Sequence, residues 1–219
     1  MESSTWEQFK ALLKKDIVSF ARSGPELAAM LLFLAVISLV AGYSSNLFAY
    51  TVDEKALSVA SATASMIVFM AIFVTGRGFS REAELGILDI LRAQPLDLTI
   101  VFAARTVFNA ILLVAVSLLG TMVLAFFGNL PLYLFVQILV LSIGFAIYLA
   151  PIIGVSSAIA VHTGGILIPS VAVAVLSAPA MQLYISGIVL GSMKPLWISI
   201  AGSLGLSLLV LALIEELLG

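Results

Sequence analysis

The sequence predicts an all-α polytopic membrane protein with six transmembrane helices, an N-terminal amphipathic helix and a short cytoplasmic helix between spans two and three. Of its 219 residues, 62% are hydrophobic and 10% are charged, whereas soluble domains carry about 25% charged residues. The apolar residues form runs long enough to cross a bilayer, which takes about 20 helical residues. Because the charged residues gather between these runs, we expect a single transmembrane domain over residues 1–219.

The composition also excludes several kinds of protein. With no cysteine, the chain can form no disulfide framework, Cys-ligated zinc site or iron–sulfur cluster. The first 22 residues contain recurrent charges and no uninterrupted apolar region, so we expect no cleavable signal peptide. We expect no metal site, no nucleic-acid partner and no catalytic residue.

Residues 5–22 predict an amphipathic helix that does not span the membrane. At 100° per residue, five large apolar side chains fall on one arc: Trp6, Phe9, Leu13, Ile17 and Phe20. Lys14, Lys15 and Arg22 lie on the other sides. Such a helix can lie in the interface, against anionic membrane lipid, or pack on the protein's own cytoplasmic surface, and the pattern leaves both open. Gly24-Pro25 is expected to break the helix.

Six spans are expected after this break. Their approximate ranges are 27–43, 57–75, 100–127, 132–161, 166–189 and 196–213. Gly128-Asn129-Leu130-Pro131 predicts a tight turn, and His162-Thr163-Gly164-Gly165 predicts another. Pro151 and Gly154 are expected to kink or break span four. In span five, Pro169 and Pro179 are expected to act as breaks.

The basic residues predict which side of the membrane each end occupies. Eight of the ten lie before span one or around the loop between spans two and three, and only Lys55 and Lys194 fall on the other side. Since Lys and Arg favour cytoplasmic loops, we expect both termini and the 77–95 loop in the cytoplasm. The protein is therefore expected in the cell (cytoplasmic or inner) membrane as a multi-pass protein.

The 77–95 loop predicts a short helix over residues 80–92. Ser80 is a suitable N-cap, Glu82 and Glu84 suit the first turn, and Pro95 ends the helix. Leu85 lies among the charged residues, opposite the apolar face. Glycine at position 86 costs about 1 kcal/mol relative to alanine, which close approach of a partner would explain. The alternative is an interfacial helix that only closes the loop.

The residues of this loop resemble a known family motif. Phe79, Glu82, Gly86, Leu88, Asp89, Leu91 and Pro95 are similar to the pattern F-x-x-E/D-x-x-x-G-x-L-E-x-L-x-x-x-P of membrane subunits of type-2 ABC exporters. Asp89 stands where that pattern usually has Glu. A second stretch, Ala150-Pro151 to Gly154-Val155, then Gly164-Gly165-Ile166-Leu167 and Pro179, narrows the resemblance to the heme exporter protein B (CcmB) family of cytochrome c maturation.

This resemblance implies a permease subunit of an ATP-driven transporter. The 80–92 helix would be its coupling helix, contacting a cytoplasmic ABC ATPase through Phe79, Glu82, Glu84, Leu85, Gly86, Leu88, Asp89, Leu91 and Pro95. The second membrane partner would be another permease copy or a related heme-handling protein. ATP would bind the partner, since the chain lacks a G-x-x-x-x-G-K-[S/T] phosphate loop. Heme is implied as the transported or handled ligand, with export and release of a heme-carrying chaperone both left open.

Four polar residues within the spans are candidates for a substrate path. Arg105 and Asn109 are one helical turn apart near the start of span three, and charged residues at membrane depth are functional candidates. Arg105 can instead extend to the interface, which the sequence favours. Gln137 and Gln182 could line a path, although hydrogen bonds between helices are commoner. His162, the single histidine, could ligate heme, but a histidine in a turn is usually only solvated.

Two other functions remain open from the sequence. One is a general type-2 ABC exporter permease for a lipid, a polysaccharide or a drug, and the other is a non-transporting membrane scaffold. An intramembrane enzyme is not expected, because the spans show no Ser/His, paired Asp or His-Glu cluster.

Overall fold

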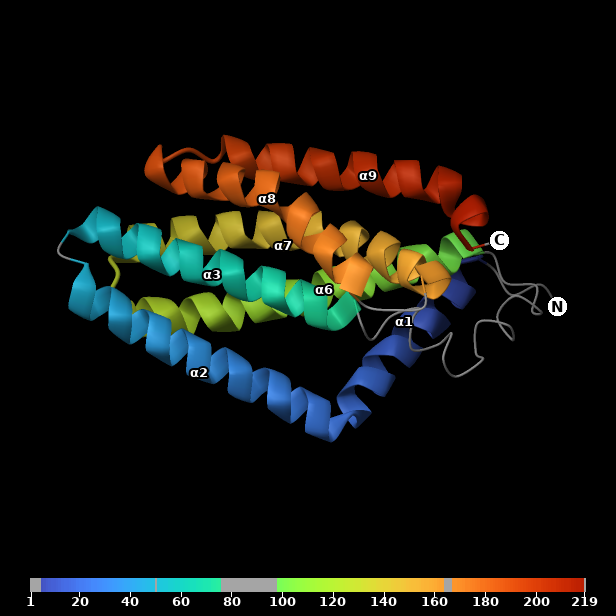
Figure 1. Cartoon of the computed structure of the whole chain (residues 1–219), viewed down its shortest axis with the longest axis horizontal. Helices are drawn as coiled ribbons and strands as arrows, with labels where there is room; N and C mark the ends of the chain where they lie inside the picture. The colour runs from blue at the N-terminus through green and yellow to red at the C-terminus, as the bar shows by residue number, and fades with distance from the viewer. Residues whose placement is uncertain (1–4, 50, 76–97, 164–166, 219) are drawn as a thin grey trace.

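The computed structural model describes residues 5–49, 51–75, 98–163 and 167–218, and helices are the only regular secondary structure in this part of the chain (Figure 1). Its seven helices are α1 (Thr5–Arg22), α2 (Gly24–Phe48), α3 (Val52–Thr75), α6 (Leu98–Gly128), α7 (Leu132–Thr163), α8 (Leu167–Val189) and α9 (Lys194–Leu218). The helical fold class is therefore confirmed for the described residues.

Five helices are long and apolar enough to cross a membrane. The qualifying stretches are Leu27–Phe48, Val52–Thr75, Thr99–Gly128, Leu132–Ser156 and Ser170–Val189. Helix α9 adds a shorter apolar stretch, Lys194–Leu209. The chain is thus a multi-pass membrane protein by length and composition, and the sixth span remains a prediction.

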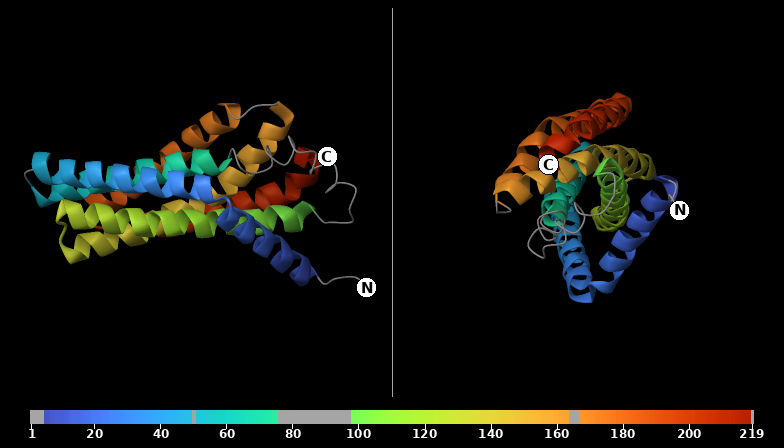
Figure 2. Two further views of the ribbon diagram at one scale, coloured as in Figure 1. Left: turned by 90° about the horizontal axis from the view of Figure 1, so that it is seen from below. Right: turned by 90° about the vertical axis from the view of Figure 1, so that its right-hand side faces the viewer.

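The long helices form an antiparallel bundle in which successive helices alternate in direction (Figures 1 and 2). The links after α2, α6 and α8 lie at one end, which we call the hairpin end. The opposite end, here the α1 end, holds α1, the C-terminus of α3 and the N-terminus of α6. Helix α6 has 31 residues, or about 46 Å at 1.5 Å per residue. It therefore exceeds the hydrocarbon thickness of about 30 Å.

Helix α1 has the bounds that the sequence predicts, and Ser23 separates it from α2. The Ser23 hydroxyl donates a hydrogen bond to the Phe20 carbonyl (2.6 Å), which closes the last turn of α1. The break comes one residue earlier than expected, because Pro25 lies in the first turn of α2, where its missing N–H leaves no bond unmade. Helix α1 then runs obliquely to the bundle and packs on α6 (Figure 2).

The links at the hairpin end are tight and well capped. Thr51 and Glu54 form a capping box before α3: the Glu54 N–H donates to the Thr51 hydroxyl (3.2 Å), and the Thr51 N–H donates to the Glu54 carboxylate (3.0 Å). After α6, Asn129 takes a positive φ of 50°, and the Leu130 N–H bonds to the Ala125 carbonyl (3.2 Å). The predicted 128–131 turn is confirmed.

The expected breaks in span five do not occur, and span four is not broken at Pro151 or Gly154, where a kink remains a prediction. Helix α7 continues through Pro151 and Gly154, and α8 continues through Pro169 and Pro179. A proline removes one backbone hydrogen bond, which neighbouring turns of a buried transmembrane helix can tolerate. Helix α7 also continues to Thr163, so His162 lies in its last turn and not in a loop.

Small residues bring the helices close together in the core. A Cβ added at Gly42 would lie 2.8 Å from Phe127 Cβ, and one at Gly154 would lie 2.7 Å from the Phe102 ring. Close approaches of the same kind occur at Gly120, Gly144, Gly187 and Gly202, whereas Gly205 has nothing within 4 Å. Glycine therefore marks close helix contacts at all of these positions except Gly205.

Exposed aromatic side chains gather at the hairpin end. They are Tyr43 and Phe48 of α2, Phe126 of α6, Tyr133 of α7 and Trp197 of α9. Each lies within about two turns of the end of its helix. Aromatic belts of this kind mark membrane–water interfaces, so these residues give one boundary of the membrane-embedded part.

Candidate functional site

The nine residues predicted to contact an ATPase lie outside the described residues, but the two helices that flank them are well defined. Helix α3 ends at Thr75 and α6 begins at Leu98, so both helices join the 76–97 segment at the α1 end of the bundle. The two helices pack directly against each other. Any displacement of residues 76–97 would therefore act on a packed pair of helices and not on one isolated helix.

Helix α6 is the most widely connected helix of the described bundle. It contacts α1, α2, α3, α7 and α9, and Figure 1 shows it running through the bundle behind α3. At its N-terminal end, the Phe20 ring of α1 meets the Phe108 ring edge-on, with 5.9 Å between ring centres. A rigid shift of α6 would therefore reach five of the other six described helices.

Arg105 and Asn109 lie in the part of α6 near the α1 end, one helical turn apart. Both are buried, with exposed fractions of 8% for Arg105 and 7% for Asn109. The sequence favours extension of Arg105 toward the interface, but protein covers most of this side chain. A buried guanidinium costs free energy unless it is paired and hydrogen-bonded, so its position points to a role within the bundle and not at the membrane interface.

Gln137 links two helices at the hairpin end. Its amide donates to the carbonyls of Gly187 (3.0 Å) and Ile188 (3.4 Å) in the last turn of α8. The last carbonyls of a helix lack partners within the helix, so Gln137 helps to satisfy them. This geometry favours the commoner of the two roles expected for Gln137, a hydrogen bond between helices.

The four residues predicted for a substrate path do not converge. Gln182 is exposed on α8, Gln137 lies near the hairpin end, and Arg105 and Asn109 lie near the α1 end. Only Arg105 and Asn109 remain together as a candidate site. Both lie in the N-terminal half of α6, where other helices pack against it.

Several buried hydroxyls also belong to the bundle interior, and the sequence analysis does not single them out. Within the described residues, the hydroxyls of Thr106, Ser156 and Tyr184 are buried without a hydrogen-bond partner. Tyr184 stacks on Phe145, with 5.8 Å between ring centres, and interacts with Thr63 without reaching hydrogen-bond geometry. Hydroxyl residues are common in transmembrane helices, so single positions of this kind give no signal in the sequence.

Among the described side chains, no group of three or more His, Asp or Glu residues could hold a metal ion. The absence of a metal site remains a prediction for the whole chain, and the side chain of His162 lies outside the described part. Comparisons of the chain with protein-family models, with curated proteins and with solved structures found no match. The function proposed below therefore depends on the residues, the fold and the motif resemblance.

Proposed function

We propose that the chain is the permease subunit of an ATP-driven ABC transporter, with a separate cytoplasmic ATPase acting on the 76–97 segment. The observation that supports this best is the packing of α3, which precedes this segment, against α6, which follows it. Rigid-body motion of a docked ATPase would move both helices together. Helix α6 would pass the motion to five neighbouring helices.

In this proposal the chain spans the membrane six times, with α9 as the last span and both termini in the cytoplasm. Five described basic residues lie at the α1 end: Lys10, Lys14, Lys15, Arg22 and Arg105. Lys55 and Lys194 lie at the hairpin end. The asymmetry supports a cytoplasmic α1 end and an external hairpin end with its aromatic belt.

The cargo follows from the motif resemblance alone. A CcmB-like permease would act in heme export, or in ATP-driven release of a heme-carrying chaperone, during cytochrome c biogenesis. It would assemble with a second permease copy or a related heme-handling membrane protein, and with ATPase subunits that hold the ATP. Genes for a small ATPase and cytochrome c maturation proteins beside this gene would favour heme over a lipid, polysaccharide or drug cargo.

The coupling segment is tested by Leu85→Asp and Gly86→Trp. Leu85→Asp places a charge where we expect an apolar contact with the ATPase. Gly86→Trp blocks the close approach of the ATPase that we expect at position 86. We expect both variants to insert in the membrane at wild-type level but to lose the co-purifying ATPase. The measurement is affinity purification of the tagged chain after co-expression with candidate ATPases.

A matched control for this experiment is Gly205→Trp, which adds the same side chain at a position with nothing within 4 Å. This variant should retain the ATPase. If Leu85→Asp and Gly86→Trp both retained the ATPase at the wild-type level, the assignment of residues 80–92 as the coupling helix would be overturned. Failure of the wild-type chain to retain any ATPase would favour a membrane scaffold.

The proposed orientation is tested with single cysteines, since the chain has none of its own. Ser80→Cys reports on the 77–95 loop, and Met193→Cys reports on the exposed link between α8 and α9. We expect a membrane-impermeant maleimide to label Met193→Cys in intact cells and Ser80→Cys only in inside-out vesicles. The reverse pattern, or labelling of both from one side, would contradict the proposed topology.

A further inference from the structure

Helix α1 keeps an exposed apolar strip after it packs on α6. Trp6 is 61% exposed and Ile17 is 43% exposed; at 100° per residue Lys10 lies about 20° from Ile17, and Lys14 borders the strip about 60° from Ile17. The Lys10 ammonium lies 4.9 Å from the centre of the Trp6 ring. Both lysines are exposed, and within the described part of the chain no ion pair is found for either. The strip therefore combines apolar surface with two available positive charges.

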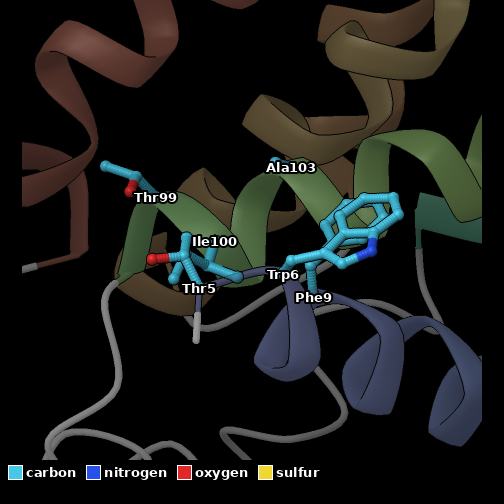
Figure 3. Close-up of a pocket in the computed structure, with 6 residues that line it drawn as sticks. All are labelled: Thr5, Trp6, Phe9, Thr99, Ile100 and Ala103. Atoms are coloured by element: carbon cyan, nitrogen blue, oxygen red, sulfur yellow. The ribbon is translucent and has the colours of Figure 1, made fainter. Parts of the chain in front are cut away.

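Beside this strip, a pocket of about 440 Å³ opens between the first turns of α1 and α6. Its lining is mostly apolar and consists of Thr5, Trp6, Phe9, Thr99, Ile100 and Ala103. The Trp6 and Phe9 rings stack with 5.5 Å between their centres and form one wall, as Figure 3 shows. Thr5 and Thr99 are seen away from these rings, toward the opposite side of the pocket (Figure 3). The pocket surface is nevertheless almost entirely apolar.

The length of α6 places this pocket near the membrane surface. Counting about 20 residues, enough to cross the hydrocarbon core, from Phe126 toward the N-terminus of α6 reaches Thr106. Ala103, Ile100 and Thr99 lie about one to two turns beyond this point. The headgroup layer is about 5 to 7 Å thick on each side, so Ala103 lies within this layer, whereas Ile100 and Thr99 lie just beyond its outer edge, about 9 to 10 Å from Thr106.

We propose that the junction of α1 and α6 is a binding site for an anionic phospholipid. Lys10 and Lys14 would bind the headgroup phosphate, the pocket would hold the outer part of the headgroup, and the strip toward Ile17 would lie against the glycerol and the first part of an acyl chain. Trp and Lys commonly take these positions in interfacial helices. The lipid would join α1 to the helix that receives the proposed ATPase motion. The site depends on the membrane placement of the bundle but not on an ATPase partner.

The fluorescence of Trp6 tests this proposal directly. Trp197→Phe leaves Trp6 as the single tryptophan of the full chain, and lipid nanodiscs can contain phosphatidylglycerol or phosphatidylcholine with brominated acyl chains. We expect brominated phosphatidylglycerol to quench Trp6 more strongly than brominated phosphatidylcholine at the same mole fraction. Lys10→Gln and Lys14→Gln should each lower the apparent lipid preference, by about fivefold per lysine at low salt.

Two further variants separate a specific site from general attraction. Lys15→Gln with Arg22→Gln removes two positive charges from the other side of α1 and should leave the preference unchanged. Ala103→Phe fills the pocket without changing charge and should reduce quenching by both lipids. Equal quenching by the two brominated lipids in the Trp197→Phe chain would overturn the proposal. An equal loss of preference in the Lys10→Gln/Lys14→Gln double variant and in the Lys15→Gln/Arg22→Gln variant would also overturn it, because net charge alone would then explain the preference.

Discussion

Replacing Gly42 with leucine is expected to separate α2 from α6 and to lower the stability of the bundle substantially. A Cβ at this position would already lie 2.8 Å from Phe127 Cβ and 3.2 Å from the Leu124 carbonyl oxygen. Neither atom belongs to the flexible end of a side chain, so the helices themselves must move. Overpacking of this kind typically costs about 1 to 3 kcal/mol. For a chain of this size we expect a loss of about 2 to 4 °C in melting temperature per kcal/mol.

The matched control is Gly205→Leu, which introduces the same side chain with nothing within 4 Å. Leucine is a better helix former than glycine, so this variant should melt at or above the wild-type temperature. The measurement is thermal unfolding of both purified variants in the same detergent. A Gly42→Leu variant that melts with the wild type would show that the contact between α2 and α6 is looser than the structure has it.

Hydrophobic length and breaker residues were sufficient to predict most of the fold. The break before Pro25 and the turn at Asn129 both follow from local backbone chemistry that the sequence displays directly. The prediction that Pro169 and Pro179 break span five was wrong, because the effect of a proline on a helix depends on packing. Gly154 accommodates the Phe102 ring, a contact between residues 52 positions apart that a local reading of the sequence does not reveal.

The candidate site could be predicted only in part. Two polar residues one turn apart on a helix must share a face, so the pairing of Arg105 with Asn109 was accessible from spacing. The burial of these two residues could not be predicted, because it depends on which helices surround α6. The role of Gln137 depends likewise on its contact with the end of α8, 50 residues away. Helix α1 shows the same limit: its amphipathic pattern was clear, but its docking on α6 was not.

Replacing Arg105 with leucine is expected to impair coupling while leaving the bundle folded. Leucine removes a buried charge together with its desolvation cost, but it also takes away the partner of the groups that interact with Arg105, so we expect some loss of stability without unfolding of the bundle. A hydrogen bond to a charged group contributes about 1.5 to 3 kcal/mol. If such bonds differ between the two states of the transporter, their loss lowers the rate by about tenfold or more. The measurement is ATP hydrolysis by the complex of this chain with its ATPase in lipid nanodiscs.

Two variants decide whether the effect belongs to Arg105. Lys194→Leu makes a comparable replacement at the exposed start of α9, at the hairpin end, and should hydrolyse ATP at the wild-type rate. Arg105→Lys keeps the charge but loses the planar guanidinium, so its rate should lie between those of Arg105→Leu and the wild type. A fully active Arg105→Leu complex would reduce this residue to a structural role. If Arg105→Leu lost both ATP hydrolysis and thermal stability, Arg105 would belong to the packing of α6. The proposed motion would then pass from the 76–97 segment through the apolar contacts between α3 and α6.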